Sequence, residues 1–254
     1  MNVLITNDDG YDAEGIQNLI KKLSEKHNVY VVAPDGNRSA VSSHLSMFKS
    51  LSLEKRKENH YTCSGYPADC AFVGIESNLF NVSFDCVVSG INLGGNLGTD
   101  IIYSGTCAAA RQAALLGVPA IAVSVDLFDY KDFRKGDFKT DAMAEFVLKN
   151  LESLVEKCKA AGKDYFLNVN ALSQDSYKGV KTTSELCRKI YGDKIKIVEE
   201  DGKLHSVFIP GSSKDVENHC ESDFSIVQEG YIALSFVSVN PDSGILVEGD
   251  GVSL

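Results

Sequence analysis

The chain has 254 residues, of which 44% are hydrophobic and 24% are charged, and both values are ordinary for a globular protein. Its formal net charge of −10 argues against a protein dedicated to long nucleic acid, because such proteins present a basic surface to the phosphate backbone. A small anionic substrate is compatible with this charge if something local supplies positive charge.

Neither the hydrophobic pattern nor the cysteines indicate a membrane or secreted protein. No apolar run approaches the roughly 20 residues that cross a bilayer. Met1 leads directly into a predicted strand, without the basic and apolar regions of a signal peptide. The seven cysteines include no C-x-x-C pair, which favours buried free thiols over disulfides or zinc. We therefore expect a cytoplasmic protein with no membrane partner.

Strands and helices alternate over residues 2–125. In chain order, the sequence predicts a buried strand at 3–5, an amphipathic helix at 16–23, buried strands at 29–33 and 86–89, an alanine-rich helix at 106–116 and a strand at 120–125. The polar segment 34–46 is too long for a tight connection, which makes it a candidate functional loop. The alternation predicts an α/β fold with a doubly wound, mostly parallel sheet.

The last part of the chain has a different pattern. Residues 139–161 predict a long amphipathic helix and 165–169 another strand. Past about residue 175 the sequence becomes polar and β-rich, with alternation at 194–198 and a late strand at 231–239, and we expect projecting hairpins. We interpret residues 1–254 as one domain: 1–175 form the α/β core, and 176–254 form an oligomerisation extension that returns to the core.

Three polar stretches follow predicted strands and should meet at the edge of the sheet where this fold class binds ligands. They are residues 7–10, 35–46 and 89–100. Asp8 and Asp9 are adjacent, so they can share an ion only if the backbone leaves the extended form, which Gly10 permits. The hydroxyl of Ser39 and the amide oxygen of Asn92 can complete an oxygen-only shell suited to Mg²⁺ or Mn²⁺. The alternative is a plain turn, in which Asn, Asp and Gly are common.

The segment 103–106 opens the alanine-rich helix. Unpaired N–H groups at a helix N-terminus, with the hydroxyls of Ser104 and Thr106 beside them, can cradle an anion. The alternative is a simple Ser or Thr N-cap. The glycine-rich residues 94–98 match neither the dinucleotide fingerprint nor a P-loop. Arg38 is the only Lys or Arg close to these motifs in the sequence, so an anion site here points to a metal ion.

Two side chains near these motifs have simpler interpretations. His44 lies in the loop 34–46 and can reach a substrate, although a solvated loop histidine is the commoner case. Asp69 is expected to cap the helix that follows it.

Four motifs in this order make the sequence resemble the SurE family, the stationary-phase survival nucleotidases. They are NDDG after the first strand, APDGNRSAVSS, SGINLGGNLGTDIIYSGT and ALLGVPAIAVS, and LNVN at 167–170 extends the match. The resemblance implies a 5′-nucleotidase, a phosphoric monoester hydrolase that uses one divalent metal ion per subunit. Its substrates would be nucleoside 5′- and 3′-monophosphates, and also short-chain polyphosphate. By position, the implied metal ligands are Asp8, Asp9, Ser39 and Asn92, and the implied phosphate-binding residues are Asn96, Ser104, Gly105 and Thr106.

Three positions depart from the family pattern. Tyr66 stands in G-Y-P where the family usually reads G-T-P, Ala171 stands where a proline usually follows LNVN, and 238–242 read SVNPD instead of S-V-T-P-L. None of them is a predicted metal ligand. They therefore bear on substrate preference and subunit contacts more than on the chemistry.

The mechanism implied by these residues is in-line attack on phosphorus. Asp8 and Asp9 are the predicted catalytic residues, and either a water or Asp8 itself is the nucleophile. One rival is a haloacid-dehalogenase-type phosphatase, but that family needs D-x-D, whereas Asp8 and Asp9 are adjacent. Another rival is a non-catalytic nucleotide-binding protein. The polar hairpins after residue 175 cannot form a core alone, and the resemblance suggests that they are exchanged between protomers of a homodimer or homotetramer.

Overall fold

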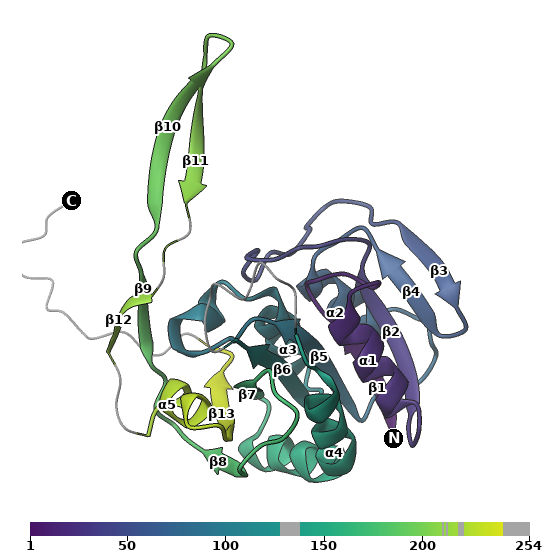
Figure 1. Ribbon diagram of the computed structural model, residues 1–254. Helices are drawn as coiled ribbons and strands as arrows, with labels where there is room; N and C mark the ends of the chain where they lie inside the picture. Colours follow the sequence, from purple (N-terminus) through teal and green to yellow (C-terminus); the bar gives the residue numbers. More distant parts are fainter. Residues whose placement is uncertain (128–137, 210, 212, 218–220, 241–254) are drawn as a thin grey trace, which may run out of the picture.

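The computed structural model describes residues 1–127, 138–209, 211, 213–217 and 221–240, and its centre is a nine-stranded sheet (Figure 1). The strands are ordered β3-β4-β2-β1-β5-β6-β7-β13-β8. Their bounds are β1 Asn2–Thr6, β2 Asn28–Pro34, β3 Leu53–Lys57, β4 His60–Cys63, β5 Cys86–Leu93, β6 Ala120–Asp126, β7 Tyr165–Leu172, β8 Val180–Thr182 and β13 Ile232–Ser238. The helices are α1 Glu14–Leu23, α2 Pro67–Glu76, α3 Gly105–Leu115, α4 Asp141–Ala161 and α5 Asp223–Gln228, with a 3₁₀ turn η1 at Gly98–Ile102.

The six strands from β4 to β7 in this order run parallel, whereas β3 and β13 pair antiparallel with β4 and β7. The predicted doubly wound, mostly parallel sheet is therefore confirmed. The chain first builds outward from β1 through β2 and then returns to place β5 on the other side of β1. The order reverses between β1 and β5, and a ligand crevice is expected at the carboxyl ends of such strands.

Apolar side chains of the sheet alternate between two helical layers. Val3 and Ile5 of β1 pack in a cluster with α1 and α4, whereas Leu4 packs in a second cluster with α2 and α3. Alanines of α3, such as Ala110 and Ala113, are buried against the sheet. Small side chains let this helix approach the strands closely, which brings its N-terminus to the crevice.

The structure also corrects several predicted boundaries. The strand predicted at 86–89 continues to Leu93, so Asn92 lies on β5 and not in a following loop. The β3–β4 pair and α5 were not predicted. Asp69 caps α2 as predicted, but from inside the first turn: α2 begins at Pro67, and the Asp69 carboxylate accepts the N–H of Tyr66 at 2.8 Å.

The last third of the chain divides between the sheet and a projecting arm. β13 and β8 join the main sheet, whereas β10 (Lys194–Glu200) and β11 (Lys203–Ile209) form a separate hairpin that extends away from it (Figure 1). At its base, β9 (Arg188–Tyr191) pairs antiparallel with β12 (Ser213–Glu217). Within the described part of the chain, no helix has the length and apolar character needed to cross a membrane. Of the departing segment 238–242, the last two residues lie outside the described residues.

Candidate active site at the carboxyl edge of the sheet

The segment after β1 turns sharply at the edge of the sheet. The Asn7 side chain donates to the carbonyl of Gly10 at 2.9 Å and accepts the Gly10 N–H at 3.2 Å. Gly10 has a φ of +100°, in the region that favours glycine. This turn takes the carboxylates of Asp8 and Asp9 out of the alternation that would place them on opposite faces of a strand.

Asp8 lies directly against the first turn of α3. Its side chain is buried, and its Oδ1 accepts the hydroxyl of Thr106 at 2.6 Å. A Cβ added at Gly105 would lie 2.7 Å from the Cβ of Asp8, so only glycine permits this approach. The structure therefore joins the predicted metal ligand Asp8 to the predicted phosphate-binding residues Gly105 and Thr106.

Asp9 faces the end of β5. Its Oδ2 accepts the N–H of Leu93 at 3.4 Å, next to Asn92 in the chain. The Asn92 amide nitrogen donates to the carbonyl of Gly94 at 2.7 Å, and its amide oxygen is the atom that would bind a cation. The turn after β1 and the end of β5 are thus in contact.

The loop after β2 reaches the same place through its backbone. The N–H of Arg38 donates to the carbonyl of Asp8 at 2.6 Å, which places Ser39 one residue from this contact. The Ser39 N–H donates to the Asn37 side chain at 2.8 Å, and Ser39 itself is exposed. All three strand-following segments predicted to meet do contribute to this edge.

The electrostatics of the two carboxylates favour a bound cation. Burial raises the pKa of Asp8, and hydrogen bonds from Thr106 oppose the shift. Burial and the charge of Asp8 raise the pKa of Asp9 to about 7. The Arg38 guanidinium, the nearest positive charge in the sequence, pairs with Asp35 at 2.8 Å and not with Asp8 or Asp9. A divalent cation would remove the repulsion between these two carboxylates.

The available donors are all oxygens. Among the described residues, no three His, Cys, Asp or Glu side chains gather to hold a metal. A cation bound by Asp8 and Asp9 would therefore complete its shell with hydroxyl or amide oxygens and water. This donor set fits a hard ion such as Mg²⁺ or Mn²⁺ and does not fit zinc.

For the N-terminus of α3, the sequence left open a simple N-cap and an anion site, and the structure has features of both. Ser104 is an N-cap, because its Oγ accepts the N–H of Cys107 at 3.0 Å. Hydrogen bonds from the backbone of Gly105 and Thr106 lower the pKa of Asp8, so these N–H groups face its carboxylate. The first turn of α3 is thus already oriented toward negative charge.

Asn96 is buried in a network that connects the glycine-rich loop to the sheet. Its amide nitrogen donates to Ser124 at 2.9 Å, and its N–H donates to the Asn170 side chain at 2.8 Å. Asn168 and Asn170 both donate to the Asn96 carbonyl. The two asparagines of LNVN therefore hold the loop, and the phosphate contact of Asn96 stays a prediction.

One buried ion pair close to the start of α3 was missed by sequence reasoning. Lys189, on β9, contacts Asp100 at 2.8 Å, and the Tyr191 hydroxyl donates to the same carboxylate at 2.7 Å. The Lys189 side chain is 7% exposed. Asp100 lies in η1, directly before the first turn of α3. The partners are 89 residues apart in the sequence, so no local pattern predicts their contact.

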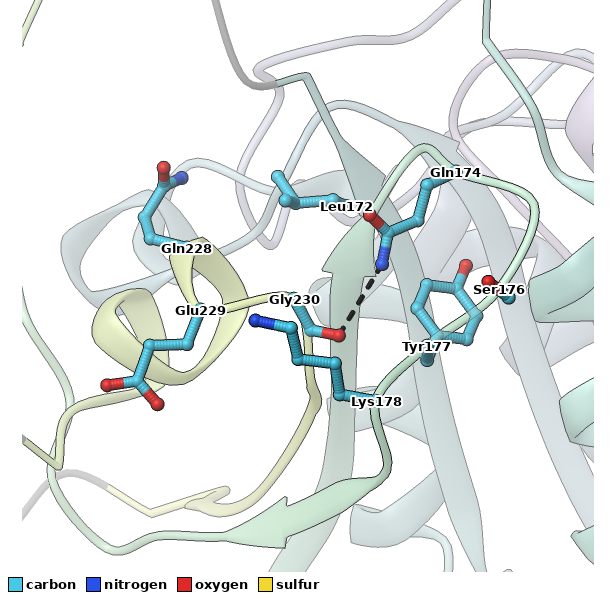
Figure 2. Close-up of a pocket in the computed structure, with 8 residues that line it drawn as sticks. All are labelled: Leu172, Gln174, Ser176, Tyr177, Lys178, Gln228, Glu229 and Gly230. Atoms are coloured by element: carbon cyan, nitrogen blue, oxygen red, sulfur yellow. Dashed lines mark hydrogen bonds between the residues drawn. The ribbon is translucent and has the colours of Figure 1, made fainter.

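A separate hollow of about 450 Å³ lies beyond the end of β7 (Figure 2). Its lining includes Gln174, Lys178 and Glu229, and Gln174 donates to the carbonyl of Gly230. None of the predicted metal or phosphate ligands lines it. The predicted metal and phosphate ligands lie instead around the carboxyl ends of β1 and β5.

The comparison with known families decides the relationship. The model of the family described as "Survival protein SurE" matches residues 3–192. The chain belongs to the SurE family. The resemblance carried by the four sequence motifs is thus confirmed.

Individual SurE proteins match over nearly the whole chain. A 5′-nucleotidase SurE from Petrotoga mobilis is 35% identical over 94% of this chain and 93% of its own length. One from Thermoanaerobacter sp. (strain X514) is 40% identical, over 92% and 91% respectively. The crystal structure of the SurE protein from Aquifex aeolicus aligns with a TM-score of 0.77 at 30% identity, over 94% of each chain. The α/β fold with its hairpin extension is therefore a SurE fold.

Proposed function

We propose that this chain is a metal-dependent 5′-nucleotidase that releases phosphate from nucleoside 5′- and 3′-monophosphates and also trims short-chain polyphosphate. The names of the Petrotoga and Thermoanaerobacter relatives support the nucleotidase reaction. The observation that supports the proposal best is the hydrogen bond between Asp8 and Thr106, because it holds the Asp8 carboxylate against a helix N-terminus. A cation and a phosphate can then be held next to each other.

The residues that would hold one Mg²⁺ or Mn²⁺ per subunit are Asp8, Asp9, Ser39 and Asn92. When bound, the ion supplies positive charge to the phosphoryl group and lowers the pKa of a water. The residues of the chain would contribute to catalysis by positioning the phosphate and by hydrogen bonding to it.

The first turn of α3 orients the phosphate. The hydroxyl of Ser104 would donate to a phosphate oxygen, and the Thr106 hydroxyl and the N–H groups of the turn would do so in place of their hydrogen bonds to Asp8. Asn96 is proposed to assist from the glycine-rich loop. Asp8, which lies against the first turn of α3, is proposed to accept the proton of an attacking water. Direct attack by Asp8 is the alternative route.

The comparisons bear differently on the two rival functions, a haloacid-dehalogenase-type phosphatase and a non-catalytic nucleotide-binding protein. Membership of the SurE family replaces the haloacid-dehalogenase alternative, which had required a D-x-D pattern. A non-catalytic nucleotide-binding protein on this fold is distinguished by turnover. We propose a cytoplasmic location, supported by buried free thiols at Cys63, Cys70, Cys86, Cys107, Cys158 and Cys187.

The test is phosphate release from a panel of nucleoside monophosphates and a short polyphosphate. Exhaustive dialysis against a chelator should abolish turnover, and Mg²⁺ or Mn²⁺ should restore it. Asp8→Asn and Asp9→Asn should each lower kcat by roughly 100-fold or more. Asp12→Asn removes an exposed carboxylate that pairs with Arg56 and serves as the matched control. Full activity in excess chelator, or wild-type turnover by a folded Asp9→Asn protein, would contradict the metal assignment.

A further inference from the structure

Tyr66 lies next to the proposed phosphate site. It directly precedes α2, and its N–H donates to Asp69 at 2.8 Å. The next residue, Pro67, touches the first turn of α3: a Cβ added at Gly105 would lie 2.9 Å from its Cγ. Tyr66 is therefore one residue away from Pro67, which contacts the first turn of α3 where the phosphate is proposed to bind.

Two side chains of the loop after β2 gather on the Tyr66 ring. The ring of His44 lies with its centroid 4.0 Å from that of Tyr66, tilted by 51°. The Arg38 guanidinium lies 5.9 Å from the same centroid. Tyr66 and Arg38 are half-buried and His44 is exposed, so the cluster is open to solvent.

The loop that carries Arg38 and His44 is held on both sides of the cluster. Ser42 donates its N–H to the carbonyl of Tyr103 at 2.9 Å, and the Ser43 hydroxyl accepts from Arg111 at 2.9 Å. The Ser46 N–H donates to Asp69 at 2.8 Å. Asp69 thus anchors both Tyr66 and the far end of the loop.

We propose that Tyr66, His44 and Arg38 bind the aromatic base of the substrate and make this chain selective for nucleoside phosphates over phosphates of plain sugars. This inference rests on the proposed function, since it names the group attached to the phosphate that α3 would bind. Aromatic rings and a guanidinium offer stacking and cation–π contacts to any base.

The experiment compares kcat/KM for adenosine 5′-monophosphate with kcat/KM for ribose 5-phosphate. Both substrates carry the same phosphate, and only one carries a base. Tyr66→Thr should lower the ratio of the two values by roughly 5- to 100-fold, mainly through KM for the nucleotide. Tyr66→Phe should keep the ratio, because it keeps the ring. Tyr165→Thr, an exposed tyrosine at the start of β7, is the matched control.

Binding of adenosine alone, followed by saturation-transfer NMR in metal-free buffer, separates this inference from the proposed function. Wild-type protein that binds adenosine but releases phosphate from neither substrate would contradict the nucleotidase and leave the base site supported. The base site would be overturned if Tyr66→Thr kept the wild-type ratio of the two kcat/KM values. It would also be overturned if Tyr66→Thr bound adenosine as well as wild type does. A loss in Tyr66→Phe as large as in Tyr66→Thr would also overturn it, since stacking does not use the hydroxyl.

Discussion

His60 shows how a single buried group links stability to pH. It is buried in β4, and its Nδ1 lies 3.2 Å from the hydroxyl of Tyr11. Burial, with a smaller contribution from Lys57, lowers the pKa of His60 from 6.5 to about 4. Between these two values the unfolded chain binds more protons than the folded protein, so the free energy of unfolding should fall as the pH falls.

Urea unfolding should therefore give a lower free energy of unfolding at pH 5 than at pH 7.5, and His60→Gln should remove the part of this loss that is due to His60. The part due to His60 should be on the order of 1–3 kcal/mol. The measure is the difference between wild type and variant, because other groups titrate in both. His205→Gln, which replaces an exposed histidine on the hairpin, should keep the wild-type dependence. Parallel curves for wild type and His60→Gln would show that His60 is not kept neutral by burial.

At the residue scale, the sequence predicted groups that follow strands and missed groups that depend on the C-terminal third. The position of Asp8 and Asp9 at the edge of the sheet was predictable, because a short strand ends just before them and a glycine follows. Their contacts with Thr106 and Leu93 follow from the parallel order of strands. Lys189 was not predictable, because its pairing with Asp100 exists only after β9 packs on η1.

At the scale of single elements, the first turn of α3 makes a sharp test. Alanine is a better helix former than glycine by about 1 kcal/mol, so propensity alone favours Gly105→Ala. In this structure the added Cβ would lie 2.7 Å from the Cβ of Asp8, closer than real Cβ atoms approach. Gly105→Ala should therefore lower kcat/KM by roughly 10-fold or more and lower the unfolding free energy by about 1–3 kcal/mol.

Gly36→Ala is the control for this substitution. Its added Cβ meets only the end of the Arg38 side chain, at 3.8 Å. Phosphate release and urea unfolding measure both variants. If the Gly105→Ala protein were fully active and more stable than wild type, the close contact between α3 and Asp8 would be refuted.

Elements were predictable where their own sequence has a period, and not where a neighbour defines them. β1, β2, β5 and β6 are short apolar runs and were predicted. β3 reads LEKRK with every residue exposed, so only its pairing with β4 marks it as a strand. α5 has six residues and is too short for a helical period to be visible.

At the scale of the whole molecule, the hairpin β10–β11 is a separate two-stranded sheet that extends away from the main sheet (Figure 1). Ile195 pairs with Phe208, and Ile197 and Leu204 lie on the same face of the two strands. These four apolar side chains are between 58% and 74% exposed in a single chain. Since isolated hairpins are marginal in water, this face needs a partner surface. We propose that a second copy supplies it, in a symmetric dimer or a dimer of dimers.

Phe208→Asp should dissociate the assembly, because the new carboxylate would be buried against apolar side chains. Light scattering at micromolar concentration should give a multiple of the 27.5 kDa chain mass for wild type and a value near 27.5 kDa for the variant. His205→Asp places the same charge on the opposite face of the hairpin, where residue 205 pairs with Val198, and should keep the assembly. A wild-type mass near 27.5 kDa would refute the oligomer. The four apolar side chains would then remain in water, and each chain would have to complete its active site alone.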